Sequence, residues 1–573
     1  MDNPTPEQKD IGRQNFHAAI GHTRRDFLKE SLTAAVVAGG SLGAFYYGYG
    51  KSVAEPVRVG VVGTGDQGSV LMGACNPEFV QVKAIADIRP YNIHRAFHGD
   101  WYSEAALEAR PGLMKVYGWE SEEEARRHVQ VYGDYRELLE HADDDGLEMI
   151  IVGLPLHLHA SATIAAMRRG LHVLCEKLMA QTVYACKEMC RAANETGLLL
   201  AVGHQRHYNI LYENAVDTIR RGLIGELAFI RAQWHRGNVP GRDSWQPPMP
   251  EAIKPDDPLA GDLERGLQSW QGRLEREEQT GGDVITWRNR VAQRQAQIAD
   301  EAVKDIAAQF GYEDGAIKDA AGNVVYERPA AEELIRWRLW ERTGGGLMAE
   351  LGSHQLDAAS IFISAVHDGV KQLPLSVVAS ANRPLFPPDR DVEDQIYCII
   401  EFPAPGFNPD DPHDNRKRIG VQYSSVNGNG FGGYGEVVCG TNGTLILETE
   451  LDVMLYKDAD VSSRVGVRDD DDLILDTQAS PGQEAAVAAA ATARVSRGYR
   501  EQIEHLAWCI RNPAPENQPR CGPEVALADA VMALVTNQAA HEERRIDFEK
   551  EWFEIDSDAT PEGVSPDLSR YDA

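Results

Sequence analysis

Positive charge is scarce in this chain. Its 573 residues include 57 Lys and Arg against 88 Asp and Glu, so the formal net charge is −31 at pH 7. A surface this acidic repels phosphate backbones, which excludes nucleic acid as an expected partner. With 43% hydrophobic residues, the chain still has enough apolar side chains for the cores of two domains.

Cysteine pairs of the C-x-x-C type are absent. The eight cysteines are scattered, and only Cys186 and Cys190 lie four residues apart on an expected helix. No His or Cys follows them at the spacing of a zinc site, so we expect no metal. Scattered buried thiols are the expectation, with one disulfide as the alternative if the protein is exported.

Long hydrophobic runs are also missing. The best candidate, residues 32–47, is short and rich in glycine, which favours a signal-peptide core over a membrane span. Residues 23–29 read TRRDFLK, the twin-arginine pattern of proteins exported in the folded state. Ser52 and Ala54 indicate a cleavage site, with an uncleaved anchor as the alternative. We therefore expect residues 1–54 to be a signal region and the protein to be periplasmic or otherwise exported.

A glycine-rich turn follows the first strand-like segment. Residues 57–62, VRVGVV, are typical of a buried parallel strand. The next six residues form a G-x-G-x-x-G fingerprint: Gly63, Thr64, Gly65, Asp66, Gln67 and Gly68. The first glycine allows a tight turn, the second lets a pyrophosphate approach the backbone, and the third permits close helix–strand packing. The pattern predicts a dinucleotide at the start of the following helix.

The choice between NAD and NADP depends on the end of the second expected strand. Residues 80–87 end at Asp87, nineteen residues after Gly68. An acidic side chain there accepts hydrogen bonds from ribose hydroxyls, which favours NAD. Arg89 is suited to a 2′-phosphate, so NADP remains the alternative. An exported protein meets no free nicotinamide pool, so we expect the cofactor to be tightly held.

Strand-like and helix-like segments then alternate. Strands are expected at residues 147–154, 171–177 and 198–204, and helices at 135–141, 159–169 and 181–196. This repetition predicts an α/β domain with a doubly wound parallel sheet. Ligands bind outside the carboxyl ends of such strands. That rule selects as candidate contacts Leu154, Pro155, Glu176, Lys177, His204, Gln205 and Arg206.

Six stretches of the chain together resemble the Gfo/Idh/MocA family, named for glucose–fructose oxidoreductase and inositol dehydrogenase. They occur in the family's order within residues 57–235 and 343–545, and read VGVVGTGDQGS, YGDYRELLE, GLPLHLHA, AAMRRGLHVLCEKLMA, VGHQRHYN and GGGLMAELGSHQLD. The resemblance implies a Rossmann domain followed by an α+β domain with an open, mostly antiparallel sheet. In the family the open sheet face often pairs subunits, so a homo-oligomer is expected.

The resemblance also implies roles for residues at the strand ends. The family's Glu-Lys-Pro motif is matched by Glu176, Lys177 and Leu178, which makes Lys177 the catalytic lysine and places Glu176 beside the cofactor. Leucine replaces the family's proline, so the resemblance does not predict the backbone conformation of this turn. The loop that covers the nicotinamide in the family is matched by residues 154–160. Leu154 and Pro155, at the start of this loop, are expected to contact the cofactor through their backbone. His159 is expected to have a packing role, with capping of the following helix as the alternative.

A second family motif is matched by Glu350 and His354, with glutamate in place of the family's aspartate. Residues four apart share one face of a helix. We assign His354 as the base that takes a substrate hydroxyl proton and Lys177 as the cation that stabilises the alkoxide. Glu350 is expected to hold the tautomer of His354 and raise its basicity.

The domain boundaries follow from these matches. A Rossmann domain is expected over residues 55–205, the second domain over 206–545, and a C-terminal tail over 546–573. Residues 245–335 depart from the family and are interpreted as a helical insertion, either a cap over the active site or an oligomer contact. Four tryptophans in or beside it either stack on sugar rings or belong to the core: Trp270, Trp287, Trp337 and Trp340.

The predicted function is hydride transfer between NAD or NADP and a sugar, cyclitol or related polyol. The family also contains NAD-recycling glycosidases, which oxidise, eliminate, hydrate and reduce in turn. The departures at Leu178 and Glu350 leave a catalytically decayed cofactor-binding protein as a third reading.

Overall fold

The computed structural model describes residues 4–19, 46–50, 52–457, 465–467, 473–475 and 497–563. The twin-arginine motif at residues 23–29 and most of the run at 32–47 lie outside these described residues. Among the helices that are described, none combines the length and apolar character needed to cross a bilayer.

The first domain is built on a six-stranded sheet in which every pairing is parallel. Its order, β3-β2-β1-β4-β5-β6, is that of a doubly wound Rossmann sheet, which confirms the predicted fold. The strands are β1 Val57–Val62, β2 Val80–Ala86, β3 Gln130–Tyr132, β4 Met149–Val152, β5 His172–Cys175 and β6 Leu200–Val202. All four residues of β4 are buried, as expected for a central strand covered on both faces.

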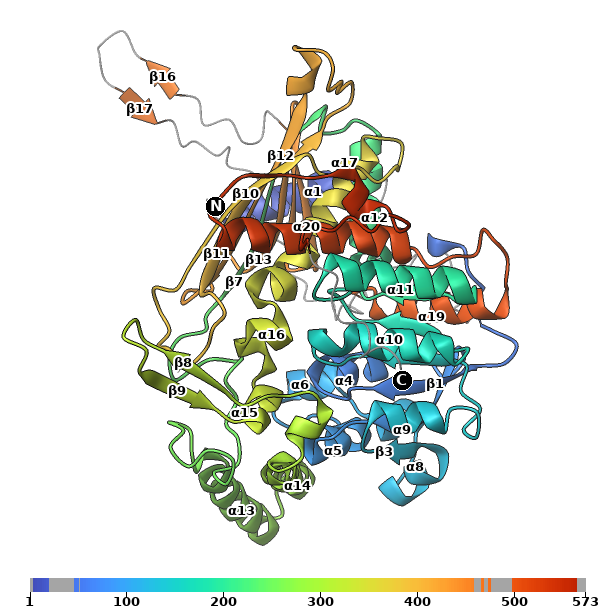
Figure 1. Cartoon of the computed structure of the whole chain (residues 1–573), viewed down its shortest axis with the longest axis vertical. Coiled ribbons are helices and arrows are strands. Elements are labelled where there is room, and N and C mark those ends of the chain that lie inside the picture. The colour runs from blue at the N-terminus through green and yellow to red at the C-terminus, as the bar shows by residue number, and fades with distance from the viewer. Residues whose placement is uncertain are drawn as a thin grey trace.

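Helices cover this sheet and connect its strands (Figure 1). They include α4 Asp66–Ala74, α5 Pro90–His98, α9 Tyr135–Glu140, α10 His159–Arg168 and α11 Val183–Thr196. A helix from the far end of the chain, α19 Tyr499–Arg511, joins them: its Ile503 and Leu506 are buried in the same core as Val59 and Val61. The first domain is therefore completed by the C-terminal part of the chain.

The second domain is built on an eight-stranded sheet of order β15-β14-β13-β7-β12-β11-β10-β18. All neighbours are antiparallel except β7 and β12, so the predicted mostly antiparallel sheet is confirmed. The strands are β7 Leu227–Arg236, β10 Ser376–Asn382, β11 Gln395–Pro403, β12 Arg418–Asn427, β13 Tyr434–Gly440, β14 Gly443–Glu448, β15 Asp452–Lys457 and β18 Ile546–Asp547. Helices α12 Ile210–Arg220, α17 Ser353–Ala365 and α20 Pro523–His541 pack on one face. The other face exposes Val378, Tyr397 and Ile399.

Both ends of the chain depart from the expected boundaries. Helix α1, Pro6–Ala19, lies before the twin-arginine motif and packs on β15, with an ion pair of 2.7 Å between Lys9 and Glu448. At the other end, Ile546 pairs with Val377 at the sheet edge and is 3% exposed. The interpretation of residues 546–573 as a tail is thus wrong at its start, because Ile546 and Trp552 are buried in the core.

The segment predicted as an insertion is a small subdomain with its own core. It contains α13 Asp262–Thr280, α14 Val284–Ile298, α15 Ala330–Ile335 and a hairpin of β8 Gly315–Lys318 and β9 Val324–Arg328, which the sequence did not predict. Met249, Val303 and Leu334 belong to its separate hydrophobic cluster. Helix α14 packs on α5 of the first domain (Figure 1), so the insertion lies against its own chain.

Candidate functional site

A cavity of about 810 Å³ lies where the carboxyl ends of the parallel strands, the second sheet and the insertion meet. This volume is within the usual range for a cofactor site. Nearly all the predicted site residues line it: Gly63, Gly65, Asp66, Gln67, Asp87, Arg89, Leu154, Pro155, His159, Glu176, Lys177, Gln205, Glu350 and His354. Four do not: Gly68 packs beneath the turn, and Thr64, His204 and Arg206 are buried outside the cavity wall. Residues separated by almost 300 positions therefore share one cavity.

The glycine turn has the shape of a dinucleotide cradle. A Cβ on Gly68 would lie 1.9 Å from the carbonyl oxygen of Gly63, so the helix can approach the strand this closely only with glycine there. A Cβ on Gly65 would point into open space, with Asn92 Nδ2 its nearest neighbour at 3.7 Å. Helix α4 begins at Asp66, directly after this opening. The open space above Gly65 and the N-terminus of α4 fit a pyrophosphate.

Asp87 lies at the end of β2 and is held in place by its neighbours. Its carboxylate accepts hydrogen bonds from the backbone N–H of Thr64 at 2.8 Å and of Arg89 at 2.9 Å. Asn92 Nδ2 donates to both carboxylate oxygens. Burial raises the pKa of Asp87, while these donors oppose the shift. A fixed carboxylate on the cavity wall is suited to ribose hydroxyls.

The other end of the cofactor groove is organised by His159 and Glu176. The His159 ring bridges two strand ends, with Nδ1 2.8 Å from the Leu178 carbonyl oxygen and Nε2 2.8 Å from that of Leu154. His159 is 2% exposed and is therefore buried between these two segments. Glu176 accepts a hydrogen bond of 2.7 Å from Gln67, which ties the glycine turn to the end of β5. Burial raises the pKa of Glu176.

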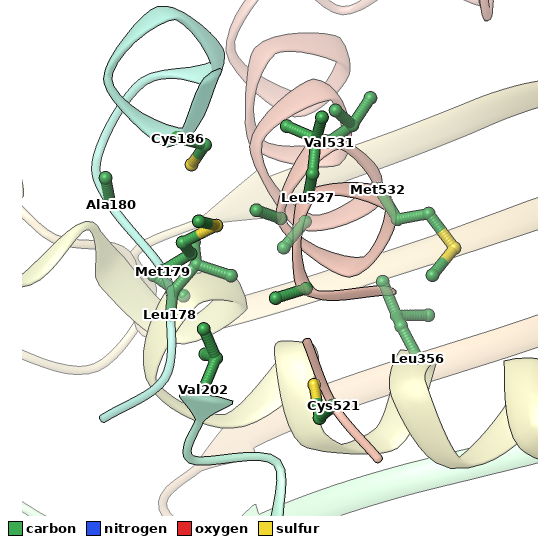
Figure 2. Close-up of a cluster of buried hydrophobic side chains, with 14 of the residues drawn as sticks. Leu178, Met179, Ala180, Cys186, Val202, Leu356, Cys521, Leu527, Val531 and Met532 are labelled. Atoms are coloured by element: carbon green, nitrogen blue, oxygen red, sulfur yellow. The ribbon is translucent and has the colours of Figure 1, made fainter. Parts of the chain in front are cut away.

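Lys177 projects into the cavity from a segment whose next residues are buried. Leu178, Met179 and Ala180 enter a hydrophobic cluster with residues of α11, α17 and α20 (Figure 2). Leu178 is 1% exposed, so the leucine in place of the family's proline serves as a core side chain. The Lys177 ammonium donates a hydrogen bond of 2.6 Å to the backbone carbonyl of Glu350. Burial lowers the pKa of Lys177, while Glu350 and Glu176 oppose the shift.

Glu350 does not hold His354 as predicted. Residues Met348–Gly352 form a π-helical turn ahead of α17, so the i, i+4 geometry of a regular helix does not apply between these two residues. The Glu350 carboxylate instead accepts a hydrogen bond of 2.7 Å from Arg338. Burial alone would raise the pKa of Glu350, but the Arg338 and Lys177 cations lower it to about 2.

His354 lies at the start of α17 with its side chain against the cavity. Its ring centroid is 5.5 Å from that of Trp234, and its buried Nδ1 has no hydrogen-bond partner among the described residues. Burial, together with the nearby Lys177 charge, lowers the pKa of His354 well below 6.5. The imidazole is therefore neutral at pH 7 and available to accept a proton.

Sequence reasoning missed several residues of the cavity wall. Trp234, Trp245, Arg236 and Arg338 all line it. The Arg236 guanidinium lies 5.9 Å from the ring of Trp234 and 5.8 Å from that of Trp245. Trp234 and Arg236 are two apart on β7, so the alternation of this strand places them on one face and was the available signal.

The tryptophans singled out from the sequence divide between the cavity wall, the core and the insertion. Trp337 lines the cavity, whereas Trp340 is 1% exposed and belongs to the core. Trp270 and Trp287 contact Arg294 and Arg290 within the insertion. Of the four, only Trp337 is placed to contact a ligand in this cavity.

A polar cluster behind the site has the residue types of a metal centre. The ligand atoms of His207, Cys521 and Asp529 lie within 4.8 Å of one another. However, the Lys371 ammonium contacts Asp529 at 2.5 Å, and His207 Nε2 lies 2.8 Å from Asp357. A protein cation thus occupies the place beside Asp529, and the cluster is interpreted as a buried ionic network.

Residues 57–204 match the family model for the oxidoreductase family with an NAD-binding Rossmann fold, GFO_IDH_MocA. The first domain has the Rossmann fold, and its whole parallel sheet lies within this match. The match covers the glycine turn, Asp87 and Lys177, and it does not reach Glu350 or His354.

Curated relatives are similar over short segments. A 1,5-anhydro-D-fructose reductase from Ensifer adhaerens is 34% identical over 110 residues, 19% of this chain and 33% of that protein. A scyllo-inositol 2-dehydrogenase (NADP(+)) from Bacillus subtilis is 29% identical over 124 residues, 22% of this chain and 35% of that protein. An α-N-acetylgalactosaminidase from Shewanella oneidensis is 29% identical over 174 residues, 30% of this chain and 34% of that protein. The chain thus spans about a third of the length of each.

Solved structures extend the likeness to the second domain. An inositol dehydrogenase homologue from Azotobacter vinelandii, solved with NADH and myo-inositol, superposes with a TM-score of 0.50. The superposition covers 87% of this chain and 98% of that one at 14% sequence identity. At this identity the comparison establishes the shared two-domain fold and nothing about substrate.

Proposed function

We propose that this protein is a nicotinamide-dependent oxidoreductase that transfers hydride between its cofactor and a CH–OH group of a sugar, cyclitol or related polyol. The observation that carries the proposal is the convergence of Lys177 and His354 on the cavity that begins at Gly65. An amine and a neutral imidazole from different domains meet beside a dinucleotide cradle. The sugar and inositol enzymes among the relatives support a polyol substrate.

The cradle residues fit a dinucleotide. Gly65 and the first turn of α4 would hold the pyrophosphate, Asp87 the adenosine ribose, and Leu154, Pro155 and Glu176 the nicotinamide end. When bound, the nicotinamide supplies a hydride acceptor or donor. All other chemistry must come from side chains of this protein.

His354 is the proposed base. Its lowered pKa keeps it unprotonated at neutral pH, so it can accept the proton of a substrate hydroxyl while the adjacent C–H bond breaks and the C=O bond forms. Lys177 is the proposed electrostatic catalyst, because its ammonium can donate a hydrogen bond to the developing alkoxide. Glu350 and Arg338 are positioning residues. The backbone carbonyl of Glu350 accepts a hydrogen bond from the Lys177 ammonium, and Arg338 donates one to the Glu350 carboxylate.

The first experiment is to purify the full-length protein, release any bound nucleotide and identify it by mass. The loaded protein is then screened with sugars, inositols and polyols while absorbance at the NADH wavelength is followed. We expect a bound or readily acquired nicotinamide dinucleotide and reduction by at least one polyol. Absence of nucleotide binding overturns the proposal. Binding without turnover of any polyol supports the decayed cofactor-binding reading instead.

A second candidate activity is hydrolysis of glycosidic bonds with the cofactor recycled. It is favoured by the α-N-acetylgalactosaminidase from Shewanella oneidensis and by a glycosyl hydrolase family 109 protein from Stenotrophomonas maltophilia, which is 29% identical over 210 residues. The two activities differ in net redox change. A dehydrogenase accumulates NADH or consumes a second sugar, whereas a recycling glycosidase releases the aglycone of aryl glycosides with neither.

We also propose that the protein is exported through the twin-arginine pathway and that the exposed face of the second sheet pairs subunits. Residues 23–29 support export. Exposed Val378, Tyr397 and Ile399 support pairing. Cell fractionation of the Arg24→Lys, Arg25→Lys double variant tests export, and sedimentation of the Ile399→Lys variant tests pairing. N-terminal sequencing shows whether cleavage after Ala54 removes α1.

A further inference from the structure

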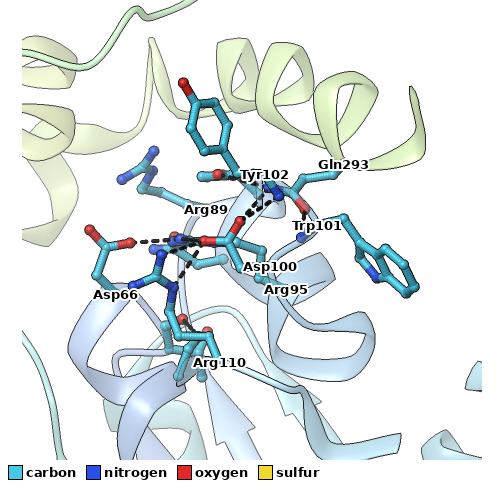
Figure 3. A network of polar contacts seen from close by, with 12 residues as sticks. Asp66, Arg89, Arg95, Asp100, Trp101, Tyr102, Arg110 and Gln293 are labelled. Atoms are coloured by element: carbon cyan, nitrogen blue, oxygen red, sulfur yellow. Dashed lines mark hydrogen bonds and ion pairs between the residues drawn. The ribbon is translucent and has the colours of Figure 1, made fainter. Parts of the chain in front are cut away.

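The insertion is fastened to the first domain by a polar network. Gln293 of α14 accepts a hydrogen bond from the Trp101 backbone N–H at 2.6 Å and donates one to Asp100 at 2.8 Å (Figure 3). Arg290 donates to the Trp101 carbonyl at 2.9 Å. These contacts hold α14 over the end of α5. The insertion also supplies Gln297 of α14, and Phe310 and Tyr312 beyond that helix, to the cavity wall.

The same insertion places an acid on the arginine that follows β2. Asp300 Oδ2 lies 2.9 Å from Arg89 Nε and 2.8 Å from a terminal nitrogen of the same guanidinium. Its other oxygen accepts the backbone N–H of Tyr91 at 3.0 Å. The side chain of Asp300 is 1% exposed and that of Arg89 is 14% exposed. This is a buried, well-satisfied ion pair between two segments more than 200 residues apart.

Every described arginine on the wall of this end of the cavity has an acidic partner. The pairs are Arg89 with Asp300, Arg95 with Asp66, Arg110 with Asp100 and Arg136 with Asp134. Asp87 adds a further carboxylate. A ribose 2′-hydroxyl is neutral and can donate to Asp87. A 2′-phosphate would bring close to two negative charges to a wall on which each cation is already balanced.

We propose that Asp300 makes this cavity selective for NAD over NADP by neutralising Arg89, and that the insertion is therefore a cofactor-selecting element. The inference rests on the proposed function, because it takes the cavity to be the dinucleotide site. It resolves the choice between Asp87 and Arg89 that the sequence left open. The deciding residue lies in the segment that departs from the family.

The test is an exchange experiment on the full-length protein. The protein is equilibrated with equal concentrations of NAD and NADP, separated from free nucleotide, and the ratio of the two bound species is measured by mass. The wild-type protein is expected to favour NAD by at least about tenfold, the effect of one charge-assisted hydrogen bond. Asp300→Asn frees Arg89 with little change of shape, and should raise the bound NADP:NAD ratio by about tenfold or more.

Two controls distinguish the effect of the freed Arg89 charge from the effect of a more loosely attached insertion. Gln293→Ala removes contacts between α14 and the first domain without changing any charge, so it should weaken both nucleotides and leave their ratio unchanged within about twofold. The Arg89→Met, Asp300→Asn double variant should lose the gain in NADP binding, because the freed cation is gone. The Arg89→Met single variant, the two Asp300 variants and the wild type together form a double-mutant cycle, and Gln293→Ala is its matched control.

The outcomes are distinct. A wild-type protein that takes up NADP as readily as NAD overturns the inference, whatever the variants do. An unchanged ratio in Asp300→Asn, with nucleotide still bound and the wild-type melting temperature retained, also overturns it. Failure of the wild-type protein to bind either nucleotide would instead count against the proposed function.

Discussion

The two ends of the cavity are built in different ways. At the nucleotide end, the glycine turn, Asp87 and Arg89 come from one stretch, residues 63–89, and each arginine on the wall is paired with an aspartate. At the substrate end, Lys177, Trp234 and His354 come from distant parts of the chain. There His354 and Lys177 both have lowered pKa values, chiefly because they are buried.

This contrast follows from what each end has to do. A dinucleotide presents the same phosphates and riboses to every protein that binds it, so one local turn and one helix N-terminus can recognise it. Catalysis at the substrate end needs a base that is unprotonated and an amine that keeps its charge at the working pH, and burial among residues of several elements shifts the pKa values that decide both states. At the nucleotide end, the charged side chains are therefore already paired within the protein. At the substrate end, the reacting groups find their reaction partner only when a ligand binds.

The largest effects are expected when the two reacting groups are removed. Lys177→Met and His354→Gln should each lower kcat by roughly 10²–10⁴-fold, the usual contribution of one proton-transfer or electrostatic group. Nucleotide binding should stay near the wild-type value, because neither side chain belongs to the glycine turn. Turnover and nucleotide affinity are measured on the same preparations. Equal losses of affinity in both variants would contradict the separation of the two ends.

Two glycine variants test the nucleotide end. Gly65→Val places a side chain in the open space above the turn, so we expect nucleotide binding to fall by more than about a hundredfold with little change in melting temperature. Gly68→Val is the contrasting control, since its Cβ would meet the Gly63 carbonyl at 1.9 Å and must disturb the fold itself. Calorimetry and nucleotide titration distinguish the two. A stable Gly68→Val protein with normal binding would refute this account of the turn.

The hydrophobic cluster that contains Leu178 supports the segment that carries Lys177 and contributes to the stability of the fold. Leu178→Ala leaves a cavity in a cluster where Leu178 is 1% exposed (Figure 2), and should lower the free energy of unfolding by about 2–5 kcal/mol. Denaturant titration measures this loss. We expect a smaller effect on turnover than in Lys177→Met, because the ammonium remains. Leu178→Met, which nearly conserves volume, is the matched control and should cost less than about 1.5 kcal/mol.

The smallest effect concerns the pH dependence of turnover. Lys177 acts as a cation, so activity falls on the alkaline side as pH rises through its pKa, which lies below 10.5. Glu350 opposes the lowering of that pKa, and Glu350→Gln should therefore move the alkaline limb of kcat/KM to lower pH. The acid limb, which reports protonation of His354, should stay below pH 6.5 in both proteins. A Glu350→Gln profile that coincides with the wild-type profile would show that the Glu350 carboxylate does not raise the pKa of Lys177.

Much of the nucleotide end was predictable because its signals are local. The run VRVGVV, the glycine spacing and Asp87 nineteen residues later predict β1, the turn and an acid at the end of β2, and the structure has each in place. The open mostly antiparallel sheet came from family resemblance. The hairpin β8–β9 was missed because its short, largely exposed strands have little periodic pattern.

The substrate end was predictable only in part. Lys177 and His354 were found through family motifs, and they line one cavity. The role given to Glu350 was wrong because a π-helical turn cannot be read from residue spacing. No local sequence pattern marks Arg338 or Trp245 as site residues. Only their position on the cavity wall identifies them.

The sequence by itself determined the Rossmann sheet, the glycine cradle and the acid at the end of β2, since hydrogen bonding and steric limits within a few residues dictate them. Tertiary structure alone decided that Arg338 rather than His354 binds Glu350, and that Asp300 neutralises Arg89. The physical reason is that electrostatic pairing depends on distance and burial in space. Neither quantity is encoded in the spacing of residues along the chain.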